Sequence, residues 1–358
     1  MSSNVFGLER PALEALFEQL GEKQFRARQL YAWLYAKRAR SFAAMSNLGR
    51  GLQARLATEH ELRWPEVAER QRSQDGTVKF LFRLDDGASI ESVYIPEARR
   101  RTICISTQAG CPLKCAFCLT GIAGYKRNLK TWEILGQVAT VIDEAPTIDP
   151  DADPDRPWNI VVMGMGEPLL NYDATVSALR ILMDPDGFAI SPRRLTLSTV
   201  GILPALEKLM AEPVRPNLAI SLHAPNPELR RELMPIEEKY RLEDVIAAAQ
   251  RYPIPSGGRV TYEYVLLKDT NDRPQHARQL VRLLRGTRSK VNLIPLNPAA
   301  EIPFGAPDHE AVEAFRGILA AAEIAVSVRR PRGQDILAAC GQLHLKKGSA
   351  ERAPVAAR

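Results

Sequence analysis

The segment at residues 111–118 has the sequence Cys-Pro-Leu-Lys-Cys-Ala-Phe-Cys, and it follows an apolar stretch at 102–107 that predicts a strand. Three thiols so close together can bind three corners of one metal site. A structural zinc ion takes four ligands. A [4Fe–4S] cluster bound by three thiolates keeps one iron free for an outside ligand. The spacing therefore indicates an iron–sulfur cluster, with a zinc site completed by Cys104 or a distant His as the alternative.

Strand and helix patterns alternate from residue 101 onward. Apolar runs predict strands at 102–107, 159–163, 195–199, 218–222, 260–267, 291–296 and 324–329. Helical spacing predicts helices at 131–142, 174–183, 242–251, 273–284 and 310–322. This alternation predicts an α/β fold with a parallel sheet, and the number of units favours a partial (β/α)6 barrel. Ligands bind at the carboxyl ends of such strands, so the cysteine segment should lie at the mouth.

The N-terminal third has other patterns. Pro11–Leu20 carries a helical apolar stripe, and Phe25, Leu30, Trp33 and Leu34 form a second one that predicts a small helical core. Asp-Gly turns flank or join the β-like runs at 77–84 and 88–95, which predicts a short hairpin. The acidic, proline-rich stretch 144–157 is expected to be a loop.

Composition limits the class of protein. Among 358 residues, 45% are hydrophobic and the net charge is +6. No apolar run is long enough for a membrane span and no secretory signal is visible, so we expect a cytoplasmic protein without membrane contact. Five cysteines are too few and odd in number for a disulfide framework.

Basic residues gather in the helical N-terminus, where the stretch between Lys23 and Arg55 contains no acid. They are Lys23, Arg26, Arg28, Lys37, Arg38, Arg40, Arg50 and Arg55. Such a block can neutralise nucleic-acid phosphates, although a solvated helix face has the same composition.

A glycine-rich turn follows the second predicted strand. Residues 161–168 are Val-Val-Met-Gly-Met-Gly-Glu-Pro. Glycine allows close approach of the backbone to a ligand, and the carboxylate of Glu167 can pair with an ammonium group.

Several motifs together resemble the RlmN/Cfr family of radical S-adenosylmethionine (SAM) adenosine methyltransferases, and the resemblance spans nearly the whole chain. The matching segments are 25–33, 91–96, 104–111, 111–118, 127–129, 164–171, 197–201, 221–226 and 338–343. The acidic stretch 144–157 and the tail 346–358 lie outside it. The resemblance implies four parts: a helical RNA-binding domain at 1–65, a β-hairpin linker at 66–100, a radical SAM partial barrel at 101–345 and a polar tail at 346–358.

The resemblance also implies cofactors and catalytic residues. Cys111, Cys115 and Cys118 would hold a [4Fe–4S] cluster, and two SAM molecules would be used per turnover. One SAM would methylate Cys340, and the other would yield a 5′-deoxyadenosyl radical that activates this methyl group. Cys104 would resolve the resulting adduct through a disulfide with Cys340. From the residues alone, Cys104 also fits a buried apolar strand position.

Glu91 is the expected proton acceptor, although a solvent-facing strand position is the commoner setting for Glu. The expected SAM-binding residues are Gly166, Glu167, Ser198, Ser221, Leu222, His223 and Asn297.

The function implied by the resemblance is methylation of C2 of an adenosine in 23S rRNA and in tRNA. The expected partners are these RNAs and a flavodoxin-like electron donor, and we expect a monomer. Methylation of C8 of the same rRNA adenosine is the near alternative, because the cysteines are shared. A non-catalytic, zinc-stabilised RNA-binding protein is the distant one.

Overall fold

The computed structural model describes residues 4–255 and 257–343. Its centre is a ten-stranded sheet in the order β1-β2-β3-β4-β7-β8-β9-β10-β11-β12. From β4 to β12 all neighbouring strands are parallel. The parallel strands are β4 (Arg100–Cys104), β7 (Trp158–Val162), β8 (Leu195–Thr199), β9 (Asn217–Ser221), β10 (Val260–Leu266), β11 (Ser289–Pro295) and β12 (Ala325–Val328).

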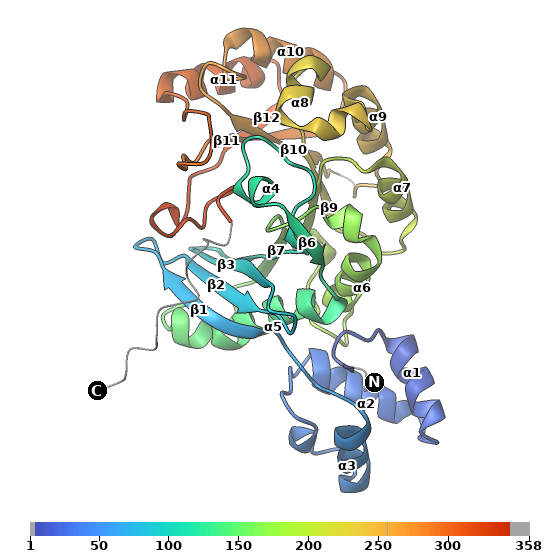
Figure 1. Ribbon diagram of the computed structural model, residues 1–358. Coiled ribbons are helices and arrows are strands. Elements are labelled where there is room, and N and C mark those ends of the chain that lie inside the picture. The colour runs from blue at the N-terminus through green and yellow to red at the C-terminus, as the bar shows by residue number, and fades with distance from the viewer. Residues whose placement is uncertain (1–3, 256, 344–358) are drawn as a thin grey trace, which may run out of the picture.

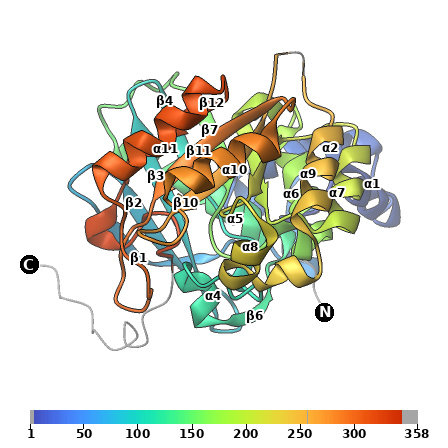
Figure 2. The ribbon, with the colours of Figure 1, turned by 90° about the horizontal axis from the view of Figure 1, so that it is seen from above.

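Helices connect these strands and cover the outside of the curved sheet, as seen from above in Figure 2. They are α5 (Thr131–Ile148), α6 (Tyr172–Met183), α7 (Leu203–Ala211), α8 (Pro227–Leu233), α9 (Leu242–Arg251), α10 (Pro274–Leu284) and α11 (His309–Ala321). The parallel strands are buried between helices and cleft, which accounts for their continuous apolar runs. The predicted partial barrel and its seven parallel strands are confirmed, and α7 and α8 are additional helices.

Three antiparallel strands extend the sheet beyond β4. They are β1 (Glu66–Arg72), β2 (Val78–Arg83) and β3 (Ser89–Glu97). The hairpin expected at 77–95 is present, and it is joined to the barrel through the pairing of β3 with β4. The segment predicted as a linker is therefore hydrogen-bonded into the main sheet and adds one strand, β1, to the hairpin.

The N-terminal helices α1 (Arg10–Gln19), α2 (Gln24–Tyr35) and α3 (Arg50–Glu59) form a lobe beside the barrel (Figure 1). Arg10 of α1 binds Asp184 beyond α6, with Nη2 at 3.0 Å from Oδ1. Phe25 does not belong to the lobe's core, because it is 45% exposed. It is five positions from Leu30, which places it on another face of α2.

The acidic stretch 144–157 is not entirely a loop. Its first five residues belong to α5, which contains Pro146 and ends at Ile148. The amide of Asp149 still donates to the carbonyl of Ala145, so the last turn closes around the proline. Proline near a helix end removes one hydrogen bond without ending the helix at once, which the composition of the stretch did not reveal.

Shorter elements complete the fold. They are the strands β5 (Gln108–Gly110) and β6 (Tyr125–Asn128), the helix α4 (Leu119–Ala123) and the 3₁₀ turns η1 (Phe42–Ala44), η2 (Pro168–Asn171), η3 (Pro192–Arg194), η4 (Pro235–Glu238) and η5 (Gln334–Ile336). No helix within the described ranges has the length and apolar character that a membrane span requires. The expected tail at 346–358 lies outside the described residues.

The segment after β12 crosses to the hairpin side of the molecule (Figure 1). The amide of Gly333 donates to Asp75 Oδ2 at 3.1 Å, and Ser73 Oγ donates to Asp335 Oδ1 at 2.6 Å. We call residues 329–343 the closing segment, because it joins the last parallel strand to the β1–β2 turn.

Candidate active site

A cleft with about 950 Å³ of empty space lies at the carboxyl ends of the parallel strands. Residues from the cysteine segment, from four strand ends and from the closing segment line it. They include Cys111, Cys115, Cys118, Gly166, Glu167, Ser198, Ser221, His223, Asn297 and Cys340. Ten of the thirteen site residues expected from the sequence therefore meet in one cavity.

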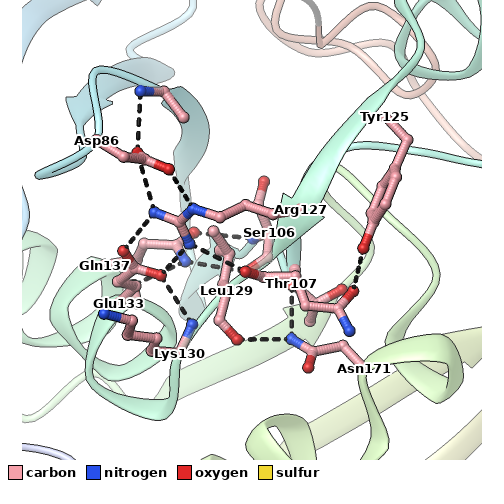
Figure 3. A network of polar contacts seen from close by, with 12 residues as sticks. Asp86, Ser106, Thr107, Tyr125, Arg127, Leu129, Lys130, Glu133, Gln137 and Asn171 are labelled. Atoms are coloured by element: carbon pink, nitrogen blue, oxygen red, sulfur yellow. Dashed lines mark hydrogen bonds and ion pairs between the residues drawn. The ribbon is translucent and has the colours of Figure 1, made fainter.

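The cysteine segment belongs to a long connection between β4 and α5, and Arg127 anchors its far end (Figure 3). The guanidinium binds Glu133 of α5 at 2.7 Å and Asp86 of the β2–β3 turn at 2.5 Å. Glu133 also accepts a hydrogen bond from the amide of Lys130, which caps α5. The pKa of Asp86 falls to about 2, chiefly because of its hydrogen bond with Arg127. The Arg127-Asn-Leu motif is thus a structural anchor for the loop.

Amide side chains hold the near end of the same connection. Asn171 donates to the carbonyls of Thr107 and Leu129, both at 2.8 Å, so it ties the two ends of the loop together (Figure 3). Gln137 of α5 donates to the carbonyl of Ser106 at 2.9 Å and accepts from its amide at 2.8 Å. The cysteine segment therefore projects from a closed and well-bonded base.

The three thiols of this segment fit an iron–sulfur cluster. Burial raises the pKa of Cys111 to about 12 and raises that of Cys115, and each thiol is further affected by Cys118. Thiolates in such a place need a cationic partner, and iron supplies one. A [4Fe–4S] cluster takes one thiolate for each iron that the protein binds, and the three thiols of this segment match that requirement.

The glycine-rich turn after β7 packs against the chain itself. A Cβ on Gly166 would lie 2.5 Å from Gln108 Cβ, and the φ of Gly166 is +102°. A Cβ on Gly164 would lie 2.7 Å from the carbonyl of Ile105. Both positions require glycine, because Ile105 of the β4–β5 connection and Gln108 of β5 leave no room for a side chain, a reason that sequence analysis did not provide.

Glu167 is held rigidly at the cleft wall. Its Oε1 accepts from Thr199 Oγ1 at 2.6 Å and from the amide of Leu169 at 3.0 Å, and its Oε2 accepts from the amide of Val200 at 3.0 Å. Burial nevertheless raises the pKa of Glu167 to about 7. A cationic ligand beside this carboxylate would favour its charged form.

Two hydroxyls and one imidazole follow on the next strands. Ser198 Oγ and Ser221 Oγ lie 3.1 Å apart. The Nδ1 of His223 accepts a hydrogen bond from the amide of Val265 at 3.0 Å, and burial lowers the pKa of His223 to about 3. The imidazole is therefore neutral, with its proton on Nε2, so it can donate from the cleft wall.

Cys340 is carried into the cleft by the closing segment. The amide of Leu119 donates to the carbonyl of Gly341 at 2.8 Å, and Asn297 Nδ2 donates to the carbonyl of Cys340 at 3.4 Å. Burial raises the pKa of Cys340, and the neighbouring Arg329 lowers it. Cys340 is thus fixed between α4, which follows the cysteine segment, and the end of β11.

Three expected site residues do not line the cleft. Cys104 is buried in β4, but it lies close enough to Cys340 for the two thiols to interact electrostatically. Glu91 is buried in β3 and pairs with Lys79 at 3.1 Å, so it is not a solvent-facing strand residue. The side chain of Leu222 is fully buried, and its amide donates to the carbonyl of Glu263.

Sequence analysis missed two charged residues of the cleft, Glu263 in β10 and Arg329 after β12. A carboxylate in the middle of the apolar run 260–267 was a signal that could have indicated Glu263. Arg329 belongs to a basic stretch that has no distinctive spacing, so its place in the cleft follows only from the fold.

Part of the N-terminal basic block is used inside the protein. Arg38 and Arg40 both bind Asp143 of α5, at 2.6 and 3.3 Å, and Arg55 binds Glu59 at 2.8 Å. In the described part of the chain, Lys23, Arg26, Arg28, Lys37 and Arg50 have no ion-pair partner, and Arg26 donates to the carbonyl of Asn47 at 2.9 Å. The other four keep their charge available for an external anion.

Comparisons with known proteins agree with this architecture. The family model described as "Ribosomal RNA large subunit methyltransferase N-terminal domain" matches residues 3–62, and the "Radical SAM superfamily" model matches residues 105–281. Curated relatives that match nearly the whole chain carry the name "Dual-specificity RNA methyltransferase RlmN". The protein of Marinobacter nauticus is 45% identical over 95% of this chain and 92% of its own length. The protein of Pseudomonas putida strain W619 is 44% identical over 95% of this chain and 89% of its own length.

One solved structure is similar over nearly the whole chain. It is the crystal structure of a radical SAM methyltransferase from Sphaerobacter thermophilus, with 42% sequence identity and a TM-score of 0.88. The match covers 95% of this chain and 99% of that one.

Proposed function

Because this chain belongs to the RlmN family of radical SAM RNA methyltransferases, we propose that it methylates C2 of an adenosine in 23S rRNA and in tRNA. The observation that supports this proposal most directly is the cleft that combines three cluster-type thiols with a fourth, separate thiol. A simple SAM-dependent transferase does not need either feature. Adenine C2 is an electrophilic aryl carbon, so its methylation requires radical chemistry.

The cofactors are a [4Fe–4S] cluster and SAM, which when bound supply the one-electron chemistry of the reaction. Cys111, Cys115 and Cys118 would hold the cluster. Glu167 offers a fixed carboxylate for an ammonium group. Further SAM contacts would come from Gly166, Ser198, Ser221, His223, Asn297 and the backbone of Leu222.

The two remaining thiols would carry the carbon to the base. Cys340 would accept a methyl group on its sulfur and lose its thiol proton. One hydrogen atom of this methyl group would be removed by the one-electron chemistry that the cofactors supply, and its carbon would then form a bond to C2 of the adenine, after which the adduct would release the C2 proton and one electron. The Cys104 thiol would lose its proton and attack the Cys340 sulfur, so that a disulfide forms, the carbon–sulfur bond breaks with its electron pair on the carbon, and this carbon takes up a proton. Glu91 would take the C2 proton. This role is supported by its place on β3, two residues before Val93, which pairs with Cys104 in the β3–β4 register.

The macromolecular partners follow from the same chemistry. The target adenosine must leave its base stack to enter the cleft. The unpaired basic residues of the N-terminal lobe are proposed RNA contacts. We further propose that the protein acts as a cytoplasmic monomer and receives electrons from a flavodoxin-like donor.

Nucleoside mass spectrometry tests the proposal. Purified protein, reconstituted anaerobically with iron and sulfide, is incubated with SAM, a reductant and unmodified 23S rRNA or tRNA. We expect 2-methyladenosine in both RNAs, and none with Cys340→Ala. Formation of 8-methyladenosine would assign the protein to the other branch of the family. A colourless preparation with zinc and without iron or sulfide would contradict the radical mechanism.

A further inference from the structure

Glu263 is a buried carboxylate in the wall of the cleft. It lies in the middle of β10, is 6% exposed and lines the cleft together with the thiols and serines described above. Its neighbours along β10 are apolar or aromatic, including Tyr262, Tyr264 and Val265. A carboxylate in such a strand is costly unless it has a defined partner.

One oxygen of Glu263 has such a partner in the protein. Oε2 accepts from Asn292 Nδ2 at 2.7 Å, and Asn292 Oδ1 accepts from Ser327 Oγ at 3.1 Å. The three residues are in register on β10, β11 and β12, which are neighbours in the sheet (Figure 1). Because the Ser327 hydroxyl donates to the side-chain oxygen of Asn292, the side-chain NH2 group of Asn292 is the end that faces Glu263. The carboxylate is therefore fixed in orientation.

The other oxygen is an unused acceptor. Within residues 4–255 and 257–343, Oε1 of Glu263 has no hydrogen-bond partner, and it is not among the fully enclosed polar atoms. It therefore has access to the cleft. Burial raises the pKa of Glu263, while Asn292 and then Arg329 lower it. Either protonation state retains an acceptor oxygen.

The groups beside Glu263 indicate what kind of ligand it accepts. Ser221 is in register with Glu263 on the adjacent strand β9, and its hydroxyl lies 3.1 Å from that of Ser198 on β8. Two hydroxyls and one carboxylate thus form a row across three strands. A carboxylate beside polar groups is a common acceptor for the hydroxyls of a ribose.

We propose that Glu263 is a further SAM-binding residue, whose free oxygen accepts a hydrogen bond from a ribose hydroxyl of the cofactor. The inference rests on the proposed function, since it assumes that SAM occupies this cleft. The distribution of lining residues supports it. The cysteine segment and Glu167 follow β4 and β7, whereas Val265, Ile294 and Leu296, which belong to β10 and the end of β11, supply an apolar wall suited to a nucleobase. The row with Glu263 belongs to the strands that connect these two regions.

Calorimetric binding to the reconstituted holoprotein tests the assignment. The probes are S-adenosylhomocysteine and its 2′-deoxy and 3′-deoxy forms. A hydrogen bond to a charged group contributes enough for a loss of about 10-fold to 100-fold in affinity. We expect the wild-type protein to bind one deoxy form weaker by this factor. The variant Glu263→Met should bind the parent compound weaker by the same factor and should no longer distinguish that deoxy form.

Glu310→Met is the matched control, because it makes the same substitution at an exposed carboxylate in the first turn of α11, which does not line the cleft. It should distinguish the ligands as the wild type does. If the wild-type protein binds both deoxy forms as tightly as the parent, the inference is wrong, whether or not Glu263→Met folds. Full discrimination by a folded Glu263→Met protein would also overturn it. Failure of the proposed function has a different signature, since the wild-type protein would then bind none of the three compounds.

Discussion

Two thiols outside the cysteine segment share the influence of one cation. Arg329 lowers the pKa of both Cys104 and Cys340, while burial raises the pKa of Cys104 to about 12 and also raises that of Cys340. Both are free cysteines in the structure. Burial thus disfavours the reactive thiolate of each cysteine, and Arg329 is the cation that partly offsets this effect at both.

The variant Cys104→Ala should trap a covalent adduct between Cys340 and RNA. Without the Cys104 thiol, no protein group displaces the methylated base from the Cys340 sulfur. Denaturing electrophoresis with labelled RNA measures the adduct, and Cys104→Ala/Cys340→Ala is the control that should show none. Multiple turnovers by Cys104→Ala without adduct would contradict the resolving role.

His223 should make the stability of the protein depend on pH. Its folded-state pKa of about 3 is below the ordinary value of 6.5, so the folded chain binds fewer protons than the unfolded chain in this window. The stability from neutral His223 is therefore complete above pH 6.5 and is lost as the pH falls toward 3. Between pH 7.5 and 5.5 the loss should be about 1.4 kcal/mol.

Urea unfolding at the two pH values measures this loss. His223→Asn should reduce the pH dependence by that amount, and Asn suits the φ of 59° at this position. His309, an exposed residue at the start of α11, provides the control variant His309→Gln. An unchanged pH dependence in His223→Asn would show that the imidazole is not kept neutral.

The connection between β4 and α5 depends on bonds at its base. Arg127, Asn171 and Gln137 fasten it to α5, to the β2–β3 turn and to the chain on both sides of the cysteine segment. The side chain of Glu133 is 1% exposed, and its ion-pair partner is Arg127. The positions of the cysteines therefore depend on residues that are not themselves expected to bind a cofactor.

Arg127→Met should destabilise the protein by about 3 kcal/mol, because it leaves the buried Glu133 without its ion-pair partner. We expect a lower iron and sulfide content after reconstitution and a lower melting temperature. Lys126→Met, at an exposed neighbouring position of β6, should match the wild type in both measurements. Equal iron content and melting temperature in Arg127→Met would contradict the anchoring role.

The main elements could be predicted from the sequence because each has a clear period. The seven parallel strands are short apolar runs, and α9 has one strongly apolar face. The pattern could not place Glu91 or Glu263, since burial of a carboxylate depends on partners from distant strands. It also could not show that Arg38 and Arg40 pair with Asp143, because ion pairs between lobes have no local signature.

The whole molecule consists of a barrel and a basic helical lobe joined by specific ion pairs. Arg10 and Arg38 connect the lobe to Asp184 and Asp143 of the barrel region, so some of the lobe's cations are consumed in docking it. The remaining cations are the ones available to RNA. The number of basic residues in the lobe is therefore larger than the number of cations that can bind an RNA phosphate.

Replacing Lys23, Arg28, Lys37 and Arg50 together with Gln should weaken RNA binding and its dependence on salt. Each lost phosphate contact lowers the slope of log K against log salt by about 0.7 to 0.9. Fluorescence anisotropy with a labelled target hairpin measures this slope between 50 and 200 mM salt. A protein with many phosphate contacts loses about 10³-fold in affinity across this range. SAM binding should be unchanged, and an unaltered slope would show that RNA lies elsewhere.

The closing segment sets the order in which the molecule can be completed. Ser73 and Asp335 are 262 positions apart in the sequence, so their contact forms only after almost the entire chain has been synthesised. Contacts over such separations form late, because a long loop must close before they contribute. Arg127, Gln137 and Asn171, which fasten the base of the cysteine loop, have the partners described above within residues 86–171. The loop that carries the cysteines can therefore be closed at its base before the closing segment places Cys340 in the cleft.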